Sequence, residues 1–187
     1  MEFIFSETYT KKDFTTNWAK WEYEDCEFVV CDFSWVDLSY TRFIACWFRE
    51  CNLSNIVTIE TSFQWVTFHL SKLLWIQFQK CNHFLFEVDF EKCILDYSIF
   101  NKMKLSGKTF RESSFREVDF SLTDLSSSIF DDCDLQGAIF SRTDLSWADL
   151  RDARNYRLDP EGNTLTWARF SLTWTPGLLT KYDIIIE

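Results

Sequence analysis

Large apolar residues recur along this chain at every fifth position, a spacing that belongs neither to a helix nor to a strand. In the stretch FDDCDLQGAIFSRTDLSWADL they are Phe130, Leu135, Phe140, Leu145 and Leu150. A small residue stands two positions before each of them. Helices repeat apolar residues near every 3.6 positions, and strands repeat them at every second position. A chain that turns a corner every five residues, with the large and the small residue both facing inward, gives this period.

The five-residue phase holds over most of the chain, from Phe28 to Leu150. Thr58 breaks the pattern, and a two-residue insertion lies between Phe78 and Phe90. Residues 20 apart, or 22 apart across the insertion, are therefore expected to stack on neighbouring turns. In this register one inward column is wholly aromatic and forms the predicted structural core: Phe28, Phe48, Phe68, Phe90, Phe110 and Phe130.

Three segments carry the repeat most clearly: CDFSWVDLS (31–39), CDLQG (133–137) and TDLSWADLR (143–151). The sequence here resembles the pentapeptide repeat family, whose consensus is A-(D/N)-L-x-x. The resemblance covers about residues 23–155 and implies an all-β fold, a right-handed quadrilateral parallel β-helix with four repeats to a coil. About seven coils are expected, which at roughly 4.8 Å per coil make a rod roughly 35 Å long.

The predicted organisation is a single structural domain with three parts. Residues 1–22 form an N-terminal lead-in or cap, residues 23–155 the β-helix, and residues 156–187 the final coil and C-terminal capping segment. Thr175 followed by Pro176 predicts a helix N-cap and a first helical position. A short capping helix over residues 176–182 is therefore expected to close the last coil, because solenoids need caps at their open edges.

Charge and composition limit the classes of partner. The 187 residues carry a formal net charge of −10, which argues against binding a phosphate backbone directly. The sequence contains no apolar segment near the roughly 20 residues of a membrane span. Its first residues lack the basic start and apolar core of a signal peptide, so a cytoplasmic location without membrane association is expected.

Enzyme chemistry is not indicated. The chain has two histidines, and neither has a nearby nucleophile with a third orienting group. The seven cysteines lack metal-site or redox spacing and are interpreted as small inward fillers. Disulfides between Cys26 and Cys46, or between Cys31 and Cys51, stay open on distance alone. The prediction is a protein that is not an enzyme, with no metal and no cofactor.

Carboxylates on outward positions suggest one function. Quinolone-resistance members of the family are acidic rods thought to imitate duplex DNA towards type II topoisomerases, and they are usually dimers joined through C-terminal helices. The resemblance implies DNA gyrase or topoisomerase IV as the protein partner. It also implies an acidic surface on which the candidate residues are Glu117, Asp131, Asp132 and Asp152.

Outward aromatic and aliphatic residues suggest another function, because the consensus places polar or small residues there. The candidate interface residues are Trp35, Leu70, Leu74, Trp75 and Tyr97. Contiguous exposed apolar surface usually marks an interface. The alternative hypothesis is therefore an engineered or orphan scaffold whose aromatic-rich surface drives self-association or binds another protein. A homodimer would form through this surface or through the C-terminal segment.

Overall fold

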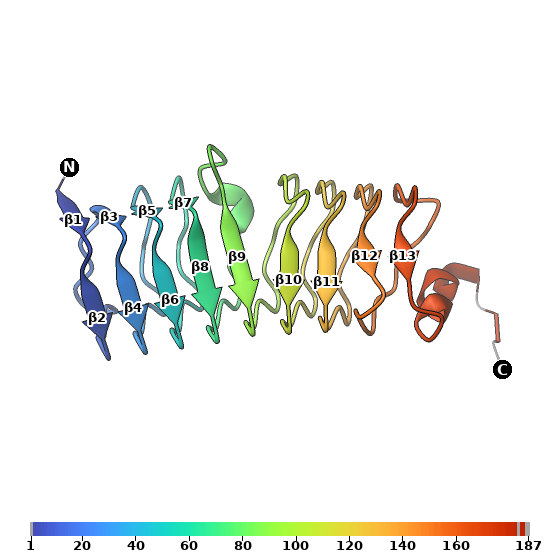
Figure 1. Cartoon of the computed structure of the whole chain (residues 1–187), viewed down its shortest axis with the longest axis horizontal. Helices are drawn as coiled ribbons and strands as arrows, with labels where there is room; N and C mark the ends of the chain where they lie inside the picture. The colour runs from blue at the N-terminus through green and yellow to red at the C-terminus, as the bar shows by residue number, and fades with distance from the viewer. Residues whose placement is uncertain (1, 183, 186–187) are drawn as a thin grey trace.

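The computed structural model describes residues 2–182 and 184–185 as one elongated rod of stacked turns (Figure 1). Met1, Asp183, Ile186 and Glu187 lie outside the described residues, and so do the outermost parts of the predicted lead-in and capping segment. The strands are β1 (Phe3–Phe5), β2 (Thr8–Thr10), β3 (Glu22–Glu24), β4 (Glu27–Val29), β5 (Arg42–Ile44), β6 (Trp47–Arg49), β7 (Ser62–Gln64), β8 (Val66–His69), β9 (Val88–Glu91), β10 (Thr109–Arg111), β11 (Ile129–Asp131), β12 (Asp149–Leu150) and β13 (Arg169–Phe170). The 3₁₀ helices are η1 (Phe78–Lys80), η2 (Thr175–Leu178) and η3 (Thr180–Tyr182).

Strands on neighbouring turns pair in parallel, and these pairs fix the register. In the nine-stranded sheet, of order β13-β12-β11-β10-β9-β8-β6-β4-β2, Phe28 pairs with Phe48 and Phe48 with Phe68. The 20-residue step becomes 22 where Phe68 pairs with Phe90, as the insertion predicts. The four-stranded sheet β1-β3-β5-β7 and rows of single β-bridges form the other sides. The parallel β-helix is therefore confirmed.

The rod has about eight turns rather than the seven predicted, since nine strands follow one another along its largest sheet. The additional first turn comes from the N-terminal lead-in. There Phe3–Phe5 pairs with Glu22–Glu24, and Thr8–Thr10 pairs with Glu27–Val29, at a step of 19 residues. Because this turn is one residue short, it falls outside the five-residue phase on which the prediction of seven depends.

Aromatic rings stack along the axis inside the tube. The six phenylalanines of the predicted core column are all buried, none more than 2% exposed. Phe28 begins a stack of four rings that ends at Phe90, with successive centroid distances of 4.8, 5.1 and 5.4 Å. Phe110 and Phe130 form a further pair at 4.9 Å. Each such pair adds on the order of 1 kcal/mol to the free energy gained by burying the rings.

The small inward residues also link the turns by hydrogen bonds. Cys51 Sγ donates to the carbonyl oxygen of Phe28 at 3.2 Å, and Thr123 Oγ1 donates to that of Phe100 at 2.8 Å. The same 23-residue step recurs at Cys46, Thr61, Ser71, Cys133 and Thr143. A buried carbonyl oxygen has two lone pairs to satisfy, and a thiol or hydroxyl satisfies one of them. This explains why Cys, Ser and Thr are frequent at a position that alanine could also fill.

The two-residue insertion forms a loop between η1 and β9 that projects from the rod (Figure 1). Leu85, predicted as the next inward residue, is wrong: its backbone φ is 53° and its side chain is exposed. Phe86 faces the core instead, with its ring centroid 6.5 Å from Phe63 and 6.2 Å from Phe78. The inserted residues shift the phase by one position here, and the five-residue period resumes at Phe90.

Each side of the tube ends in a corner residue, two positions after the inward residue, whose backbone φ is positive. At Trp35, Asn55 and Trp75, φ is 64°, 61° and 63°. Gly107 and Gly137 occupy such corners, but most corner residues are not glycine. The left-handed region costs an L-residue roughly 1–2 kcal/mol, so the stacked turns hold their corners under strain. Corner side chains point away from the tube and provide most of its exposed aromatic surface.

The C-terminal end is closed by η2 and η3, where one short helix is predicted (Figure 1). Pro176 lies in the first turn of η2 as expected. The N-cap, however, is Trp174 rather than Thr175, whose Oγ1 donates to the carbonyl oxygen of Ser171 at 2.8 Å. The N–H of Leu158 donates to the carbonyl oxygen of Gly177 at 3.2 Å and joins this segment to the last turns.

Candidate functional site

One edge of the rod carries a row of corner residues that we call the aromatic corner. It consists of Trp35, Asn55, Trp75 and Tyr97, each one turn beyond the residue before it. Backbone hydrogen bonds hold these corners against the next turn; the N–H of Asn55, for example, donates to the carbonyl oxygen of Leu74 at 2.9 Å. Neighbouring turns of a parallel β-structure lie about 4.8 Å apart, so the row has a fixed spacing.

The indole of Trp75 and the ring of Tyr97 stack face to face, with centroids 4.2 Å apart and 7° between their planes. Trp35, Trp75 and Tyr97 are 75%, 55% and 42% exposed. Since Asn55 occupies the turn between them, Trp35 and Trp75 lie about 10 Å apart along the axis. An exposed aromatic row on a rigid backbone is typical of an interaction surface.

A groove of about 250 Å³ opens between the two indoles, over Asn55. Its remaining lining residues are Ile56, Val57, Thr58, Gln77 and Lys80. Thr58 Oγ1 donates to the carbonyl oxygen of Gln77 at 2.9 Å, which ties this wall of the groove together. The groove therefore combines two aromatic walls with an apolar base and an amine.

The two leucines predicted for the interface lie beside the aromatic corner rather than on it. Leu74 is half-buried and directly precedes Trp75. Leu70 is exposed with a φ of 52°, and it belongs to the neighbouring corner, whose row continues to Lys92 one turn later. The structure thus brings Trp35, Trp75 and Tyr97 into one row and places Leu70 apart from them.

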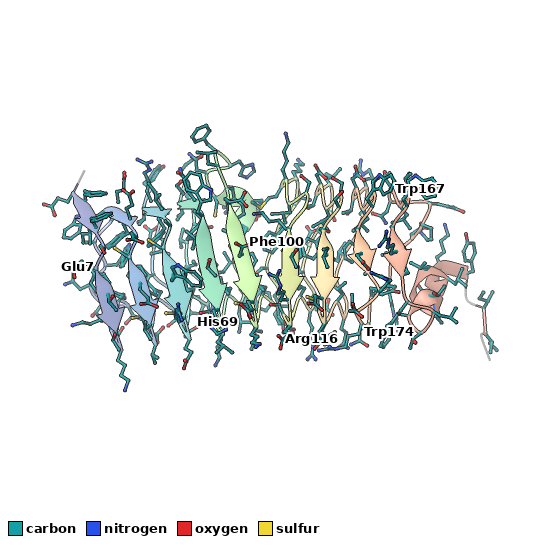
Figure 2. The ribbon with its side chains drawn as sticks, in the orientation of Figure 1. Glu7, His69, Phe100, Arg116, Trp167 and Trp174 are labelled. Carbon is teal, nitrogen blue, oxygen red and sulfur yellow. The ribbon has the colours of Figure 1, made fainter. Side chains whose placement is uncertain are left out.

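A second stacked pair lies outside the predicted interface. The indoles of Trp147 and Trp167 have centroids 5.7 Å apart and 30° between their planes, and Figure 2 labels Trp167. They occupy a different corner, since the aromatic corner continues through Glu117 and Gly137. Their 20-residue spacing, each two positions after a leucine, is the sequence signal that could have identified them.

The carboxylates proposed for an acidic surface are interleaved with basic residues. Asp131 lies opposite Arg111 in the β10–β11 pair. Asp132 forms an ion pair with Arg154, and Asp152, one turn beyond Asp132, is exposed. These three carboxylates therefore share the nine-stranded side and its edge with basic side chains rather than forming a uniformly negative face.

Glu117 lies away from these three residues, on the continuation of the aromatic corner beyond Tyr97. Its carboxylate covers Gly137 and fills the space that a Cβ there would occupy. The residue before it, Arg116, labelled in Figure 2, donates from Nε to Asp134 at 2.8 Å. The four predicted carboxylates are thus divided between two corners.

All seven cysteines are free thiols and all are buried. Burial raises the pKa of Cys46, Cys93 and Cys133 to about 12. Cys31 differs, because its interaction with the Cys51 thiol lowers the pKa of Cys31 to about 7 and raises that of Cys51. A thiol reacts through its thiolate, so both burial and a raised pKa slow its chemistry.

We expect the folded protein to react slowly with a thiol reagent at neutral pH and to release seven thiols on denaturation. Cys31 should react first, because its pKa is the lowered one and it lies near the first turn. Timed labelling with peptide mapping measures this order. Rapid labelling of Cys51 or Cys93 in the folded state would contradict the inward register.

Other kinds of site receive no support from the described part of the chain. Within it, the structure brings no three His, Cys, Asp or Glu residues together as a metal-binding group. Among the same residues, no helix has the length and apolarity needed to cross a membrane. The aromatic corner and the carboxylate-bearing corners are therefore the surfaces to compare.

Repeats, register and fold together define the class of protein. The family model for pentapeptide repeats matches the sequence in eight copies, over residues 24–55, 100–132 and 119–154. The chain is a pentapeptide repeat protein, built on a fold that serves as a structural and binding scaffold. No curated protein matches the sequence.

Solved structures are similar to this chain over most of its length. A trypsin-treated variant of QnrB1, a plasmid-mediated fluoroquinolone resistance protein, is 20% identical over 98% of this chain and 99% of that chain, with a TM-score of 0.50. A second trypsin-treated QnrB1 variant is 19% identical over 100% of both chains, with a TM-score of 0.49. HetL, a pentapeptide repeat protein involved in heterocyst differentiation regulation in the cyanobacterium Nostoc, is 18% identical over 90% of this chain and 87% of that chain, with a TM-score of 0.47. The first of these likenesses supports the β-helix fold.

Proposed function

We propose that this protein is a non-enzymatic rod that binds another protein through its aromatic corner. The observation that carries the proposal is the row of Trp35, Trp75 and Tyr97, exposed and partly stacked on corners of fixed spacing. Tryptophan and tyrosine are the residues that most often anchor protein interfaces. The corner residues also keep positive φ angles at a conformational cost, which is consistent with a role outside folding.

Replacing both Trp35 and Trp75 by asparagine is expected to abolish partner binding or self-association without destabilising the rod. Asparagine tolerates positive φ, and changes at exposed positions usually alter stability by less than about 0.5 kcal/mol. Removing two interface anchors should weaken association at least tenfold, because such anchors are each worth about 2 kcal/mol or more. Sedimentation and chemical denaturation on the same samples measure both quantities.

The matched control is the pair Trp147→Asn and Trp167→Asn, which removes the other stacked indoles at corners of similar φ. Binding should survive in this control. If the two double variants lose association equally, the partner recognises apolar surface in general and the aromatic corner is not the site. If Trp35→Asn with Trp75→Asn unfolds the protein, these side chains belong to the core.

A second candidate is a DNA mimic that binds a type II topoisomerase such as DNA gyrase or topoisomerase IV and modulates quinolone sensitivity. It is favoured by the net charge of −10 and by the shared fold with QnrB1, described as a fluoroquinolone resistance protein. Three carboxylates also succeed one another at one corner, a turn apart: Glu112, Asp132 and Asp152. Their partners Lys92 and Arg154 weaken the likeness to a phosphate backbone.

A gyrase supercoiling assay, with and without a quinolone, tests this second candidate. The mimic should inhibit supercoiling or protect the enzyme, and Asp132→Asn with Asp152→Asn should remove the effect. The double variant at Trp35 and Trp75 should leave it intact. An unchanged reaction at excess protein would exclude the mimic and leave the aromatic-corner proposal standing.

The proposal includes a cytoplasmic location and a homodimer. Seven free thiols suit a reducing compartment. Exposed apolar side chains in the C-terminal segment, among them Leu172, Ile184 and Ile185, offer one contact surface for a second copy, and the aromatic corner offers another. Dimerisation that persists in Trp35→Asn with Trp75→Asn would assign the contact to the C-terminal segment.

A further inference from the structure

We propose that the groove over Asn55, between the indoles of Trp35 and Trp75, is a binding site for a small planar aromatic anion. The site lies within the aromatic corner, but binding of a small molecule there does not depend on whether a protein also binds that surface. The argument rests on the spacing of the corner residues, the lining of the groove and the position of Lys80.

The aromatic corner lacks one ring. Trp75 and Tyr97, one turn apart, stack with centroids 4.2 Å apart and nearly parallel planes. Trp35 and Trp75 are separated by two turns, and the small side chain of Asn55 occupies the turn between them. A ring placed over Asn55 would lie about 5 Å from each indole, within the 4.5–7 Å range of favourable aromatic pairs. A ligand ring would thus complete a continuous stack from Trp35 to Tyr97.

The lining of the groove favours a particular kind of ring. Val57 and Ile56 give it an apolar base, and the two indoles give it flat walls. Its volume of about 250 Å³ suits one or two fused rings rather than a large ligand. Saturated rings of the same size would bury similar area but would lose the stacking attraction of both indoles. The geometry therefore selects flat aromatic molecules.

Charge selects among flat molecules. Lys80 ends η1 and lines the groove, and among the residues that the structure describes no carboxylate lies within ion-pair distance of its amine. The nearby Thr58 hydroxyl already donates to the Gln77 carbonyl oxygen, so the amine is the group positioned to receive an anion. A carboxylate on the ring edge would form a charge-assisted hydrogen bond with Lys80. A cationic ring would meet the same amine and be repelled.

Isothermal titration of the protein with 2-naphthoate tests the proposal. We expect one site per chain, with much weaker binding of cyclohexanecarboxylate, which lacks a π system, and of 2-naphthylmethylamine, which is cationic. Loss of one indole should weaken 2-naphthoate about tenfold or more, because stacking on an aromatic side chain is worth about 1–3 kcal/mol. Equal binding of cyclohexanecarboxylate and 2-naphthoate would overturn the proposal.

Two variants locate the site. Asn55→Trp should fill the groove and abolish binding, and its backbone is suited to this change because Trp35 and Trp75 occupy corners with almost the same φ. The control Lys102→Trp places an indole at another exposed corner, where φ is 63°, and should bind 2-naphthoate normally. Undiminished binding to folded Asn55→Trp would overturn the proposal.

Trp35→Asn provides a second test if Asn55→Trp fails to fold. It should weaken 2-naphthoate binding about tenfold. Trp167→Asn, which opens the other indole pair, should leave binding unchanged. Loss of binding in Trp167→Asn but not in Trp35→Asn would place the ligand at the other pair and refute the site. Lys80→Gln should weaken 2-naphthoate while leaving neutral naphthalene derivatives unaffected, and equal loss of both would refute the role of charge.

Discussion

Replacing Phe68 by alanine is expected to lower the free energy of unfolding by about 3–5 kcal/mol. Phe68 is fully buried, and its ring stacks on Phe48 at 5.1 Å and on Phe90 at 5.4 Å. Removing it leaves a gap in the middle of the stack. The neighbouring turns cannot collapse into this gap, because parallel pairing on both sides fixes the distance between them. Equilibrium denaturation in urea measures the loss.

The chain offers a matched control at Phe84, a phenylalanine that is 72% exposed in the loop between η1 and β9. Phe84→Ala removes the same atoms from solvent-exposed surface and should change stability by less than about 0.5 kcal/mol. A loss below about 1 kcal/mol for Phe68→Ala would show that the rings do not support one another across the turns.

Replacing Gly177 by alanine is expected to detach the C-terminal segment while the rod stays folded. A Cβ at Gly177 would overlap the backbone carbonyl oxygen of Tyr156, which has no freedom to move as a side-chain end would. Overpacking of this kind costs about 1–3 kcal/mol or more. The hydrogen bond from the N–H of Leu158 to the carbonyl oxygen of Gly177 should be lost together with the contact.

Trypsin cleavage after Lys181 reports this detachment. In the wild type, Lys181 is held by Asp159 at 2.6 Å and by Glu161 at 2.7 Å. Cleavage should become at least tenfold faster in Gly177→Ala, since 1.4 kcal/mol corresponds to a factor of about ten. Gly162→Ala is the control, because a Cβ there meets no atom closer than 3.5 Å. Equal cleavage rates in the wild type and Gly177→Ala would show that the segment is not docked as described.

The interior of this fold is predictable from sequence because a strict period leaves one register. Phe28, Phe48 and Phe68 share a column for no other reason than their spacing of 20, and the structure pairs them directly. The prediction fails where the spacing departs from the period. The first turn has a step of 19 residues, and the loop before β9 moves the inward position from Leu85 to Phe86.

The surface is less predictable, because it depends on conformations and on lateral neighbours that the period does not specify. Phase alone places Trp35 and Trp75 outward, two turns apart. The positive φ of these corners has no signal in the sequence, since tryptophan stands where glycine or asparagine is the usual indicator. The ion pair between Asp132 and Arg154 joins residues 22 apart through side-chain orientation, so a list of carboxylates overestimates the acidic surface.

The stacking of turns has a consequence for how the chain folds during its synthesis. Each paired segment bonds to the segment about 20 residues earlier, as Phe28 does with Phe48, rather than to distant parts of the chain. A solenoid of this kind depends only on nearest neighbours. The loop that must close to add one layer therefore has the same length at the start and at the end of the rod, and its entropic cost does not grow. Each new turn can dock as soon as about 20 further residues have left the ribosome, so the rod can be completed layer by layer in the order of translation.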